Sequence, residues 1–323
     1  MTRDWTALVL GATGGIGGAV ARALLDRGWA VRGLHRRAGE RPAGRIAWVQ
    51  GDAGQAEDVR AAARGASLIV HAVNPPGYRD WDRLVPTMLE ASIEAAWTEG
   101  ARILLPGNVY NYGPDAWPLI AEDAPQAPTS RKGRIRVAME RRLKDSGLDV
   151  LVVRAGDYFG PGAANSWFSQ ALVTPGRVPA RLLHPGREAI GHQWAYLPDV
   201  AETMLRLLEH PALPRGFSRF HMEGHWDADG MAMVGAIRRA LGKPDLPVRR
   251  LPWWALRLAS PIMPFAREVT EIAPLWHAPV RLDNGRLRAL LGEEPHTPLD
   301  LAVEAALRDL GCLPAPAARE AMA

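Results

Sequence analysis

The sequence predicts an α/β fold in which a doubly wound parallel sheet carries a smaller C-terminal α/β cap region. Three observations support this prediction. The first half of the chain alternates short β-rich runs with alanine-rich helical segments, which is typical of right-handed β–α–β crossovers. The run Val150-Leu151-Val152-Val153 is continuously apolar, as expected for a strand buried on both faces. A glycine-rich turn directly follows the first apolar run.

The alternation extends over about the first half of the chain. We expect strands at residues 7–10, 30–34, 46–50, 68–73, 102–105 and 150–154, and helices at about 15–27, 56–64, 80–99 and 131–146. After Gly156 the pattern changes, because prolines and glycines cluster and tryptophans become common. We therefore predict a nucleotide-binding domain over residues 1–155, which also receives about 187–210, and a substrate-binding cap made mainly of residues 156–323.

The glycine-rich turn is the most informative motif. It joins the first predicted strand to the first helix and contains Gly11, Thr13, Gly14, Gly15, Ile16 and Gly17. At such a turn the free backbone N–H groups and the positive end of the helix dipole hold a pyrophosphate. The strand–turn–helix context predicts a Rossmann-type dinucleotide site. The alternative is a glycine-rich turn without a ligand.

The residues after the second strand indicate which dinucleotide is bound. An NAD-selective site has an acidic residue there that accepts hydrogen bonds from the ribose. This chain has His35, Arg36 and Arg37 instead. Because a guanidinium matches a phosphate in a bidentate way, we predict that NADP(H) is preferred over NAD(H), with Arg36 the better candidate. The alternative is a solvated basic turn.

Two further segments fit a cofactor site. Asp52 and Ala53 follow the third strand, where a carboxylate can accept a hydrogen bond from the adenine amino group. Ala72, Val73 and Asn74 follow the fourth strand, where backbone groups can line the adenosine ribose and the diphosphate. Because parallel strands end at one edge of the sheet, we expect both segments to lie beside the glycine turn.

Composition argues against several other kinds of partner. The net charge is only +4, and the arginines occur in pairs rather than runs, so nucleic-acid binding has little support. The single cysteine, Cys312, allows neither an intrachain disulfide nor a thiolate cluster and fits a cytoplasmic protein. His221 and His225 do not form a His-Glu-x-x-His pattern, so no metal is expected. No apolar stretch approaches the roughly 20 residues of a membrane helix, and no membrane partner is expected.

Several segments resemble the extended branch of the short-chain dehydrogenase/reductase superfamily. The glycine turn looks like the glycine fingerprint of that branch, and Asp52 looks like its adenine-contacting aspartate. Further similar segments are Val109-Tyr110 with Gly113, Glu122-Asp123 with Pro125, the run from Arg154 to Pro161, and Asp199-Val200-Ala201. The resemblance covers about residues 7–210 and implies a nicotinamide cofactor with an epimerase, dehydratase or reductase activity.

The family also implies a catalytic Tyr-x-x-x-Lys pair and a nearby serine or threonine, and this chain departs from that pattern. Alignment on Glu140 puts Lys132 at the tyrosine position and Arg136 at the lysine position. Pro106 falls at the serine position, and no Tyr-x-x-x-Lys occurs elsewhere in the chain. Hydride transfer to a carbonyl needs a proton donor, so another group must supply the proton or the family reaction is lost.

Four residues are candidates for this catalytic work. Tyr110 follows the fifth strand, and a neighbouring cation, Lys132 or Arg136, could stabilise its phenolate. Lys132 could itself act as the acid, and Asn108 could donate a hydrogen bond to a substrate carbonyl. The alternatives are a pocket wall for Tyr110 and a solvated, ion-paired helix face for Lys132, Arg136 and Glu140.

The nicotinamide end of the cofactor is predicted to meet residues after the fifth and sixth strands. Pro106, Gly156 and Tyr158 occupy those places. Two functions stay open. The first is an NADP(H)-dependent oxidoreductase or epimerase that acts on a carbonyl or sugar-nucleotide substrate with a modified proton donor. The second is a non-catalytic NADP(H)-binding sensor. We favour the enzyme, with a small-molecule substrate, and a homodimer through helices 80–99 and 131–146 is compatible with the family.

Overall fold

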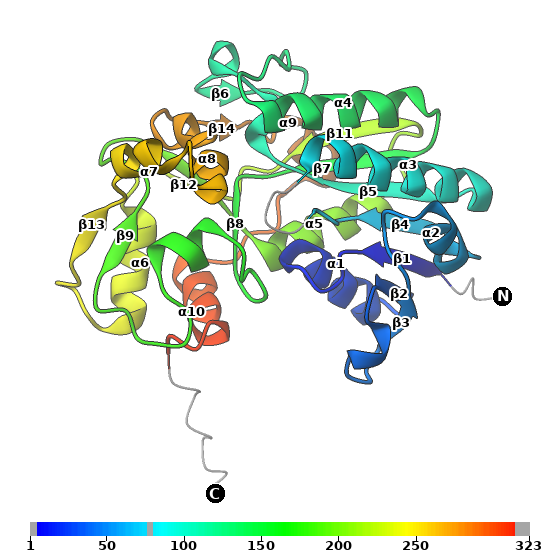
Figure 1. Cartoon of the computed structure of the whole chain (residues 1–323), viewed down its shortest axis with the longest axis horizontal. Coiled ribbons are helices and arrows are strands. Elements are labelled where there is room, and N and C mark those ends of the chain that lie inside the picture. Colours follow the sequence, from blue (N-terminus) through cyan, green and yellow to red (C-terminus); the bar gives the residue numbers. More distant parts are fainter. Residues whose placement is uncertain (1–4, 76–79, 314–323) are drawn as a thin grey trace, which may run out of the picture.

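A seven-stranded parallel sheet forms the centre of the computed structural model, which describes residues 5–75 and 80–313 (Figure 1). The strand order is β11-β7-β5-β4-β1-β2-β3. These strands are β1 (Thr6–Leu10), β2 (Ala30–His35), β3 (Ile46–Gln50), β4 (Leu68–His71), β5 (Arg102–Gly107), β7 (Val150–Arg154) and β11 (Phe217–His221). The order reverses at β1, and the crevice at such a reversal is where open α/β sheets bind ligands.

Helices cover both faces of the sheet because successive side chains of a strand point to opposite sides. Ala7 and Val9 join the core beneath α1 (Gly15–Asp26) and α5 (Leu197–Glu209). Leu8 and Leu10 join the core beneath α2 (Ala56–Ala63), α3 (Trp81–Glu99) and α4 (Arg131–Asp145). This arrangement confirms the predicted doubly wound class. The homodimer expected through α3 and α4 stays a prediction.

The predicted elements of the first half agree with the structure to within two residues at each end. The strand predicted at 68–73 ends at His71, because the next residues pass close to the glycine turn. A Cβ built on Gly11 would lie 2.5 Å from the carbonyl oxygen of Ala72. The chain there must therefore leave the strand path to form the crevice.

The seventh strand, β11, comes from the range assigned to the cap. It pairs in parallel with β7, from Phe217 beside Val150 to His221 beside Arg154. Its sequence, Phe-Ser-Arg-Phe-His, lacks the continuous apolar run of the central strands. Phe217 and Arg219 are only half-buried, so this strand does not have to be apolar throughout.

The cap lies at the carboxyl edge of the sheet, at the left of Figure 1. One small sheet has the order β12-β10-β8, formed by β8 (Asp157–Phe159), β10 (His192–Tyr196) and β12 (His225–Asp227). Other pairs are β9 (Leu182–His184) with β13 (Val248–Arg250) and β6 (Leu119–Ile120) with β14 (Arg281–Leu282). The remaining helices are α6 (Ala232–Leu241), α7 (Trp253–Ala259), α8 (Pro264–Thr270), α9 (Gly285–Leu291) and α10 (Leu299–Asp309).

The segment predicted at about 187–210 to return to the first domain is divided between the two regions. β10 belongs to the small cap sheet, and Trp194 lies in the aromatic core of the cap with Phe159 and Trp276. α5 follows at once and packs against α1 in the core of the first domain. The chain thus connects cap and sheet directly, which holds the two walls of the crevice together.

Candidate functional site

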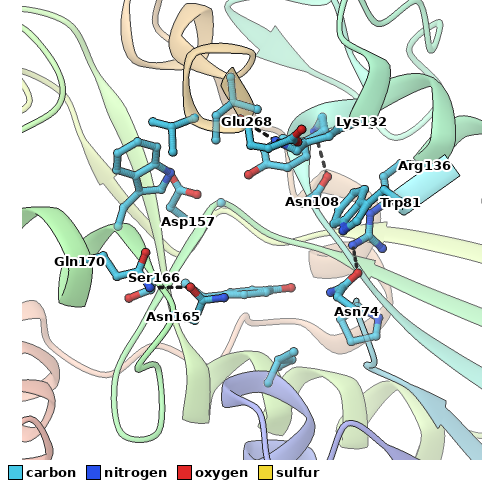
Figure 2. A pocket seen from close by; sticks show the side chains of 18 of the residues that line it. Asn74, Trp81, Asn108, Lys132, Arg136, Asp157, Asn165, Ser166, Gln170 and Glu268 are labelled. Atoms are coloured by element: carbon cyan, nitrogen blue, oxygen red, sulfur yellow. Dashed lines mark hydrogen bonds and ion pairs between the residues drawn. The ribbon is translucent and has the colours of Figure 1, made fainter. Parts of the chain in front are cut away.

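A cavity of about 380 Å³ lies between the carboxyl edge of the sheet and the cap (Figure 2). The loops after β4, β5 and β7 converge there because parallel strands end at one edge. Eleven sequence-predicted site residues line it: Ile16, Ala72, Val73, Asn74, Pro106, Asn108, Tyr110, Lys132, Arg136, Gly156 and Tyr158. The other predicted residues belong to the glycine turn and to the loops after β2 and β3, outside the cavity wall.

Backbone geometry explains the glycines of the turn. Gly11 has φ +88°, and its close approach to Ala72 leaves no room for a side chain. A Cβ on Gly17 would lie 2.2 Å from the Gly11 carbonyl oxygen. Gly14 caps α1 without a side-chain hydrogen bond, so the N–H groups of the first turn are left for an anion. Thr13 and Gly14 are exposed, whereas Gly15 is half-buried beside Leu197. This cradle fits a pyrophosphate.

The loop after β2 carries basic side chains on the surface. His35 Nδ1 accepts a hydrogen bond from the Arg37 backbone N–H at 3.1 Å. The Arg37 guanidinium lies 3.2 Å from Glu40. Arg36 makes no ion pair with residues 5–75 or 80–313, and its side chain is exposed. Arg36 is therefore better placed than Arg37 to meet a phosphate.

The turn after β3 is organised by carboxylates. Asp52 Oδ1 accepts a hydrogen bond from the Gly54 N–H at 2.8 Å, and the Asp52 N–H donates to Asp58 Oδ2 at 2.8 Å. Ala53 packs against the core beneath α2. Asp52 thus shapes this turn, and its contact with adenine stays a prediction.

Arg136 reaches the cavity from α4. Its Nη2 donates to Asn74 Oδ1 at 2.9 Å, and the guanidinium lies 5.4 Å above the Trp81 ring (Figure 2). Burial lowers the pKa of Arg136, and the nearby phenols of Tyr110 and Tyr158 oppose that change. Its Nε is buried without a hydrogen-bond partner among the described residues. A buried donor without a partner costs free energy, so an acceptor on a ligand fits here.

Lys132 connects α4 to the cap. Its Nζ lies 3.0 Å from Glu268 Oε2 and 3.6 Å from Glu271 Oε2, and its side chain is 1% exposed. Its backbone N–H also donates to Glu271 Oε1 at 2.8 Å. Glu268 lies in α8, and Glu271 follows that helix. Lys132 is therefore a buried joint between domain and cap, and both carboxylates hold its cation; its alignment with the family's tyrosine stays a prediction.

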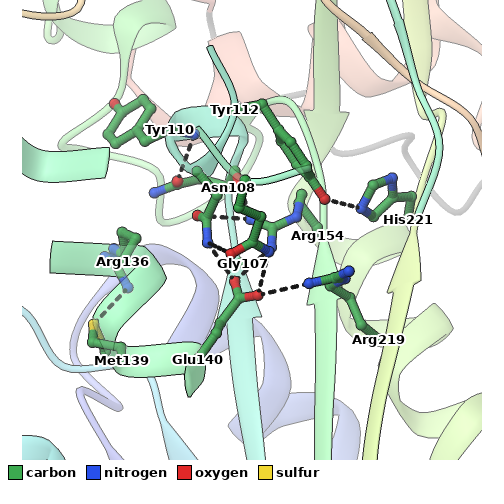
Figure 3. A network of polar contacts seen from close by, with 12 residues as sticks. Gly107, Asn108, Tyr110, Tyr112, Arg136, Met139, Glu140, Arg154, Arg219 and His221 are labelled. Atoms are coloured by element: carbon green, nitrogen blue, oxygen red, sulfur yellow. Dashed lines mark hydrogen bonds and ion pairs between the residues drawn. The ribbon is translucent and has the colours of Figure 1, made fainter. Parts of the chain in front are cut away.

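Asn108 and Tyr110 belong to the loop after β5. Asn108 Oδ1 accepts a hydrogen bond from the Tyr110 N–H at 3.0 Å and starts the short turn Val109–Asn111 (Figure 3). Arg154 donates to the Asn108 carbonyl oxygen. The Oδ1 acceptor of Asn108 is used in this turn, and its Nδ2 amide is the donor that a ligand can meet.

Tyr158 forms a neutral wall of the cavity. Its O–H donates to the Gly107 carbonyl oxygen at 3.0 Å, and burial raises its pKa. Pro106 and Gly156 lie beside it with their backbones buried. A Cβ on Gly156 would lie 2.2 Å from the Gln193 carbonyl oxygen, so the chain is tightly packed there. The contacts of these residues with a nicotinamide stay predictions.

The solvated helix face considered for Lys132, Arg136 and Glu140 is wrong, because all three residues are buried. Glu140 lies in a polar network behind the cavity (Figure 3). Its Oε1 accepts hydrogen bonds from Arg154 at 2.5 Å and from Asn111 at 2.9 Å. Burial opposes ionisation of Glu140, but the neighbouring arginines and amide outweigh it and lower its pKa. The network braces the middle of α4 against β7 and β11.

Besides Glu268, two titratable groups of the cavity were missed by the sequence analysis. His71, the last residue of β4, has Nδ1 2.8 Å from Ser92 Oγ, while its Nε2 is buried without a partner among the described residues. Burial, with Arg136, lowers the pKa of His71 to about 3. Asp157 Oδ2 lies 2.9 Å from His192 Nε2. His71 ends β4, and Asp157 lies three residues after the end of β7. This position at the carboxyl end of a strand is a sequence signal that could have identified both residues.

Comparisons with known proteins agree with this architecture. An NAD(P)H-binding family model matches residues 11–165. A 3-diazoavenalumate denitrifying reductase from a Streptomyces species is 32% identical over 266 residues, which cover 76% of this chain and 84% of that protein. An aspartate-semialdehyde dehydrogenase from Prochlorococcus marinus is 30% identical over 138 residues, 41% of this chain, and the match spans only 36% of that relative.

Solved structures show the same fold. The enzyme WbmH from Bordetella bronchiseptica, in complex with NAD+, is 18% identical with a TM-score of 0.70, covering 95% of this chain and 99% of that one. A UDP-glucuronic acid 4-epimerase from Bacillus cereus, in complex with NAD, is 16% identical with a TM-score of 0.72, covering 94% and 98%. At these identities the likeness concerns the fold alone.

Two further findings concern residues 5–75 and 80–313. None of the helices there is both long and apolar enough to cross a bilayer. Within the same ranges, no three His, Cys, Asp or Glu side chains gather closely enough to hold a metal ion. His225 instead lies beside His296, with ring centroids 4.4 Å apart.

Proposed function

The chain belongs to the extended short-chain dehydrogenases/reductases, an NAD(P)-binding family, and from this premise we propose that it is an NADP(H)-dependent reductase with Tyr110 as its modified proton donor. One observation carries the proposal. Tyr110, Asn108 and Arg136 line a single cavity together with Ile16 of the glycine-turn helix and Tyr158. The substrate is a small molecule with a reducible carbonyl or comparable group, and we expect the reaction to take place in the cytoplasm.

The residues present fit the cofactor. The open first turn of α1 would hold the pyrophosphate, and Arg36 would meet the 2′-phosphate. Arg136 and His71 both line the cavity, and Nε of Arg136 and Nε2 of His71 have no hydrogen-bond partner among the described residues. NADPH supplies a hydride when bound. The relative that is named a reductase supports reduction over epimerisation.

The protein must deliver a proton to the substrate oxygen as the carbon gains its hydride. We assign this proton to the O–H of Tyr110. The positive charge of Arg136, held over Trp81, stabilises the phenolate that is left until solvent returns a proton. The Nδ2 amide of Asn108 donates to the same oxygen and orients it. Tyr158 is less suited, because burial raises its pKa.

Paired phenylalanine variants test this assignment. We expect Tyr110→Phe to lower kcat by about 100-fold or more, which is the usual contribution of a positioned general acid. The dissociation constant for NADPH should change less than twofold. Tyr158→Phe is the matched control and should retain most of kcat. The measurement is NADPH oxidation with aromatic aldehydes and ketones. A larger loss in Tyr158→Phe than in Tyr110→Phe would overturn the assignment.

The second candidate function, a non-catalytic NADP(H) sensor, is favoured by the joint at Lys132. A buried ion pair between α4 and α8 occupies the family's catalytic position, close to where a nucleotide would contact Arg136. A structural change caused by nucleotide binding at Arg136 would then reach the cap through this ion pair. Tight NADPH binding without oxidation by any substrate, together with a cap protected from proteolysis only when NADPH is bound, would favour the sensor.

A further inference from the structure

The cap half of the cavity is built from apolar side chains. Trp167 precedes the π-helical turn Phe168–Leu172, Leu183 lies in β9, and Leu256 lies in α7. The complete apolar set from the cap is Trp167, Ala171, Leu183, Leu251, Leu256, Phe265, Val269 and Ile272. Walls of this kind bind a ligand mainly by removing its apolar surface from water.

The cations of the cavity wall come from the sheet domain and not from the cap. Among the described lining residues, both cations come from α4 and none comes from the cap. Lys132 is held by Glu268 and Glu271, whereas Arg136 turns toward Asn74 on the cofactor side. The lining carboxylates, Asp157 and Glu268, add negative charge. The cap wall thus offers no cation to a second anionic ligand.

This balance opposes a nucleoside diphosphate sugar as substrate. Such a substrate brings two negative charges that require cations or charge-assisted hydrogen bonds when they leave water. The polar groups that the cap does offer are neutral: Asn165, Ser166 and Gln170 (Figure 2). Gln170 Nε2 donates to Asn165 Oδ1 at 2.6 Å. Amides and hydroxyls of this kind suit the hydroxyl or carbonyl groups of an uncharged ligand.

We infer that the substrate is a small, apolar, ring-containing carbonyl compound and that the cap excludes sugar nucleotides. The inference rests on the proposed function, which sets the carbonyl toward Asn108 and Tyr110. The ring then packs among Trp167, Leu256 and Ile272. Because the cavity of about 380 Å³ must also admit the nicotinamide end, one or two rings fill the remaining space.

A binding experiment tests the cap pocket without requiring turnover. The uncharged dye N-phenyl-1-naphthylamine fluoresces when it enters an apolar pocket, and we expect saturable binding to the full chain. UDP-glucose should not displace it, with or without NADP+. An uncharged aromatic ketone should displace it. Displacement by UDP-glucose at a lower concentration than the ketone would overturn the inference.

Two leucines of α7 provide matched variants. Leu256 lines the cavity, whereas Leu258, two residues further on, is 74% exposed. Leu256→Asp should weaken dye binding at least tenfold, and Leu258→Asp should leave it within twofold. Circular dichroism and the melting temperature check that both variants fold; if Leu256→Asp does not fold, Leu256→Asn replaces it. Equal effects of the two substitutions would place the dye on the outer surface and contradict the inference.

The same samples separate this inference from the proposed function. NADPH binding is measured by quenching of tryptophan fluorescence in the absence of dye. If the wild-type chain does not bind NADPH, the proposed reductase is overturned. The dye result would still report on the cap. Intact NADPH binding with displacement of the dye by UDP-glucose would keep the reductase and overturn the apolar substrate.

Discussion

The two ends of the crevice are specified in different ways. At the glycine turn, backbone shape makes the site: Gly11 and Gly17 are required because neighbouring carbonyl oxygens lie where their side chains would be. At the start of α4, side chains make the site: Lys132 and Arg136 are buried and held by partners from distant segments. A backbone site tolerates little change, whereas a side-chain site can be rebuilt while the helix stays. This difference fits the prediction that the cofactor end resembles the family while the catalytic end departs from it.

The joint at Lys132 should give the largest effect on stability. Lys132→Met removes one of the two cations that contact the buried carboxylate of Glu268, and Arg131 remains 3.1 Å from it. We therefore expect the free energy of unfolding to fall by about 3.5 kcal/mol, toward the lower end of the range for broken buried pairs. The control is Arg142→Met on the same helix, whose exposed pair with Glu90 should contribute less than about 1 kcal/mol. Urea unfolding followed by fluorescence measures both. Similar losses in the two variants would show that the joint is not a special feature of α4.

The stability of the protein should be nearly as sensitive to substitutions in the glycine turn, because a side chain there would overlap with the backbone. Gly17→Ala puts a Cβ 2.2 Å from the Gly11 carbonyl oxygen, and we expect a loss of about 3 kcal/mol in stability and at least tenfold in NADPH affinity. Gly44→Ala is the control, because nothing lies within 4 Å of its added Cβ. Thermal melts and NADPH titration distinguish the two. Unchanged NADPH affinity in a folded Gly17→Ala variant would contradict the role of the turn.

At the cofactor end of the crevice, the surface residue Arg36 is expected to decide which dinucleotide is preferred. Arg36→Glu should weaken NADPH by about 2 kcal/mol, roughly 30-fold, and leave NADH within about twofold, because only NADPH carries the 2′-phosphate. Arg37→Glu should have a smaller effect, since Arg37 already pairs with Glu40. Titration of each variant with both nucleotides provides the test. Equal losses for NADPH and NADH would show that the loop attracts both nucleotides by its charge alone and does not recognise the 2′-phosphate.

A smaller effect is expected from His71 at low pH. Burial keeps its folded-state pKa at about 3, well below the usual value of 6.5, so the unfolded chain takes up a proton that the folded chain does not. Its contribution to stability is present above pH 6.5 and declines as pH falls toward 3. Between pH 7 and 5.5 the loss should be about 1 kcal/mol, and His71→Gln should lose less over that interval. Parallel urea titrations of wild type and variant check the difference; identical pH slopes would contradict it.

Local sequence was enough to predict most of the sheet and the nucleotide end of the site. The strands β1, β4 and β7 follow from runs of apolar residues, because a strand buried on both faces must be apolar nearly throughout. The glycine turn follows from spacing within a single strand–turn–helix unit. In each case the residues that decide the structure lie next to one another in the chain, so a local pattern carries the information.

The tertiary structure alone decided what surrounds the catalytic positions. The spacing of Lys132, Arg136 and Glu140 suits an exposed ion-paired helix face equally well, and only the fold buries them. Glu268, the partner of Lys132, lies 136 residues away, and His192 lies 35 residues from Asp157. The edge strand β11 likewise takes its place by pairing with β7. Contacts between distant segments depend on the packing of the whole chain, and no local periodicity in the sequence encodes them.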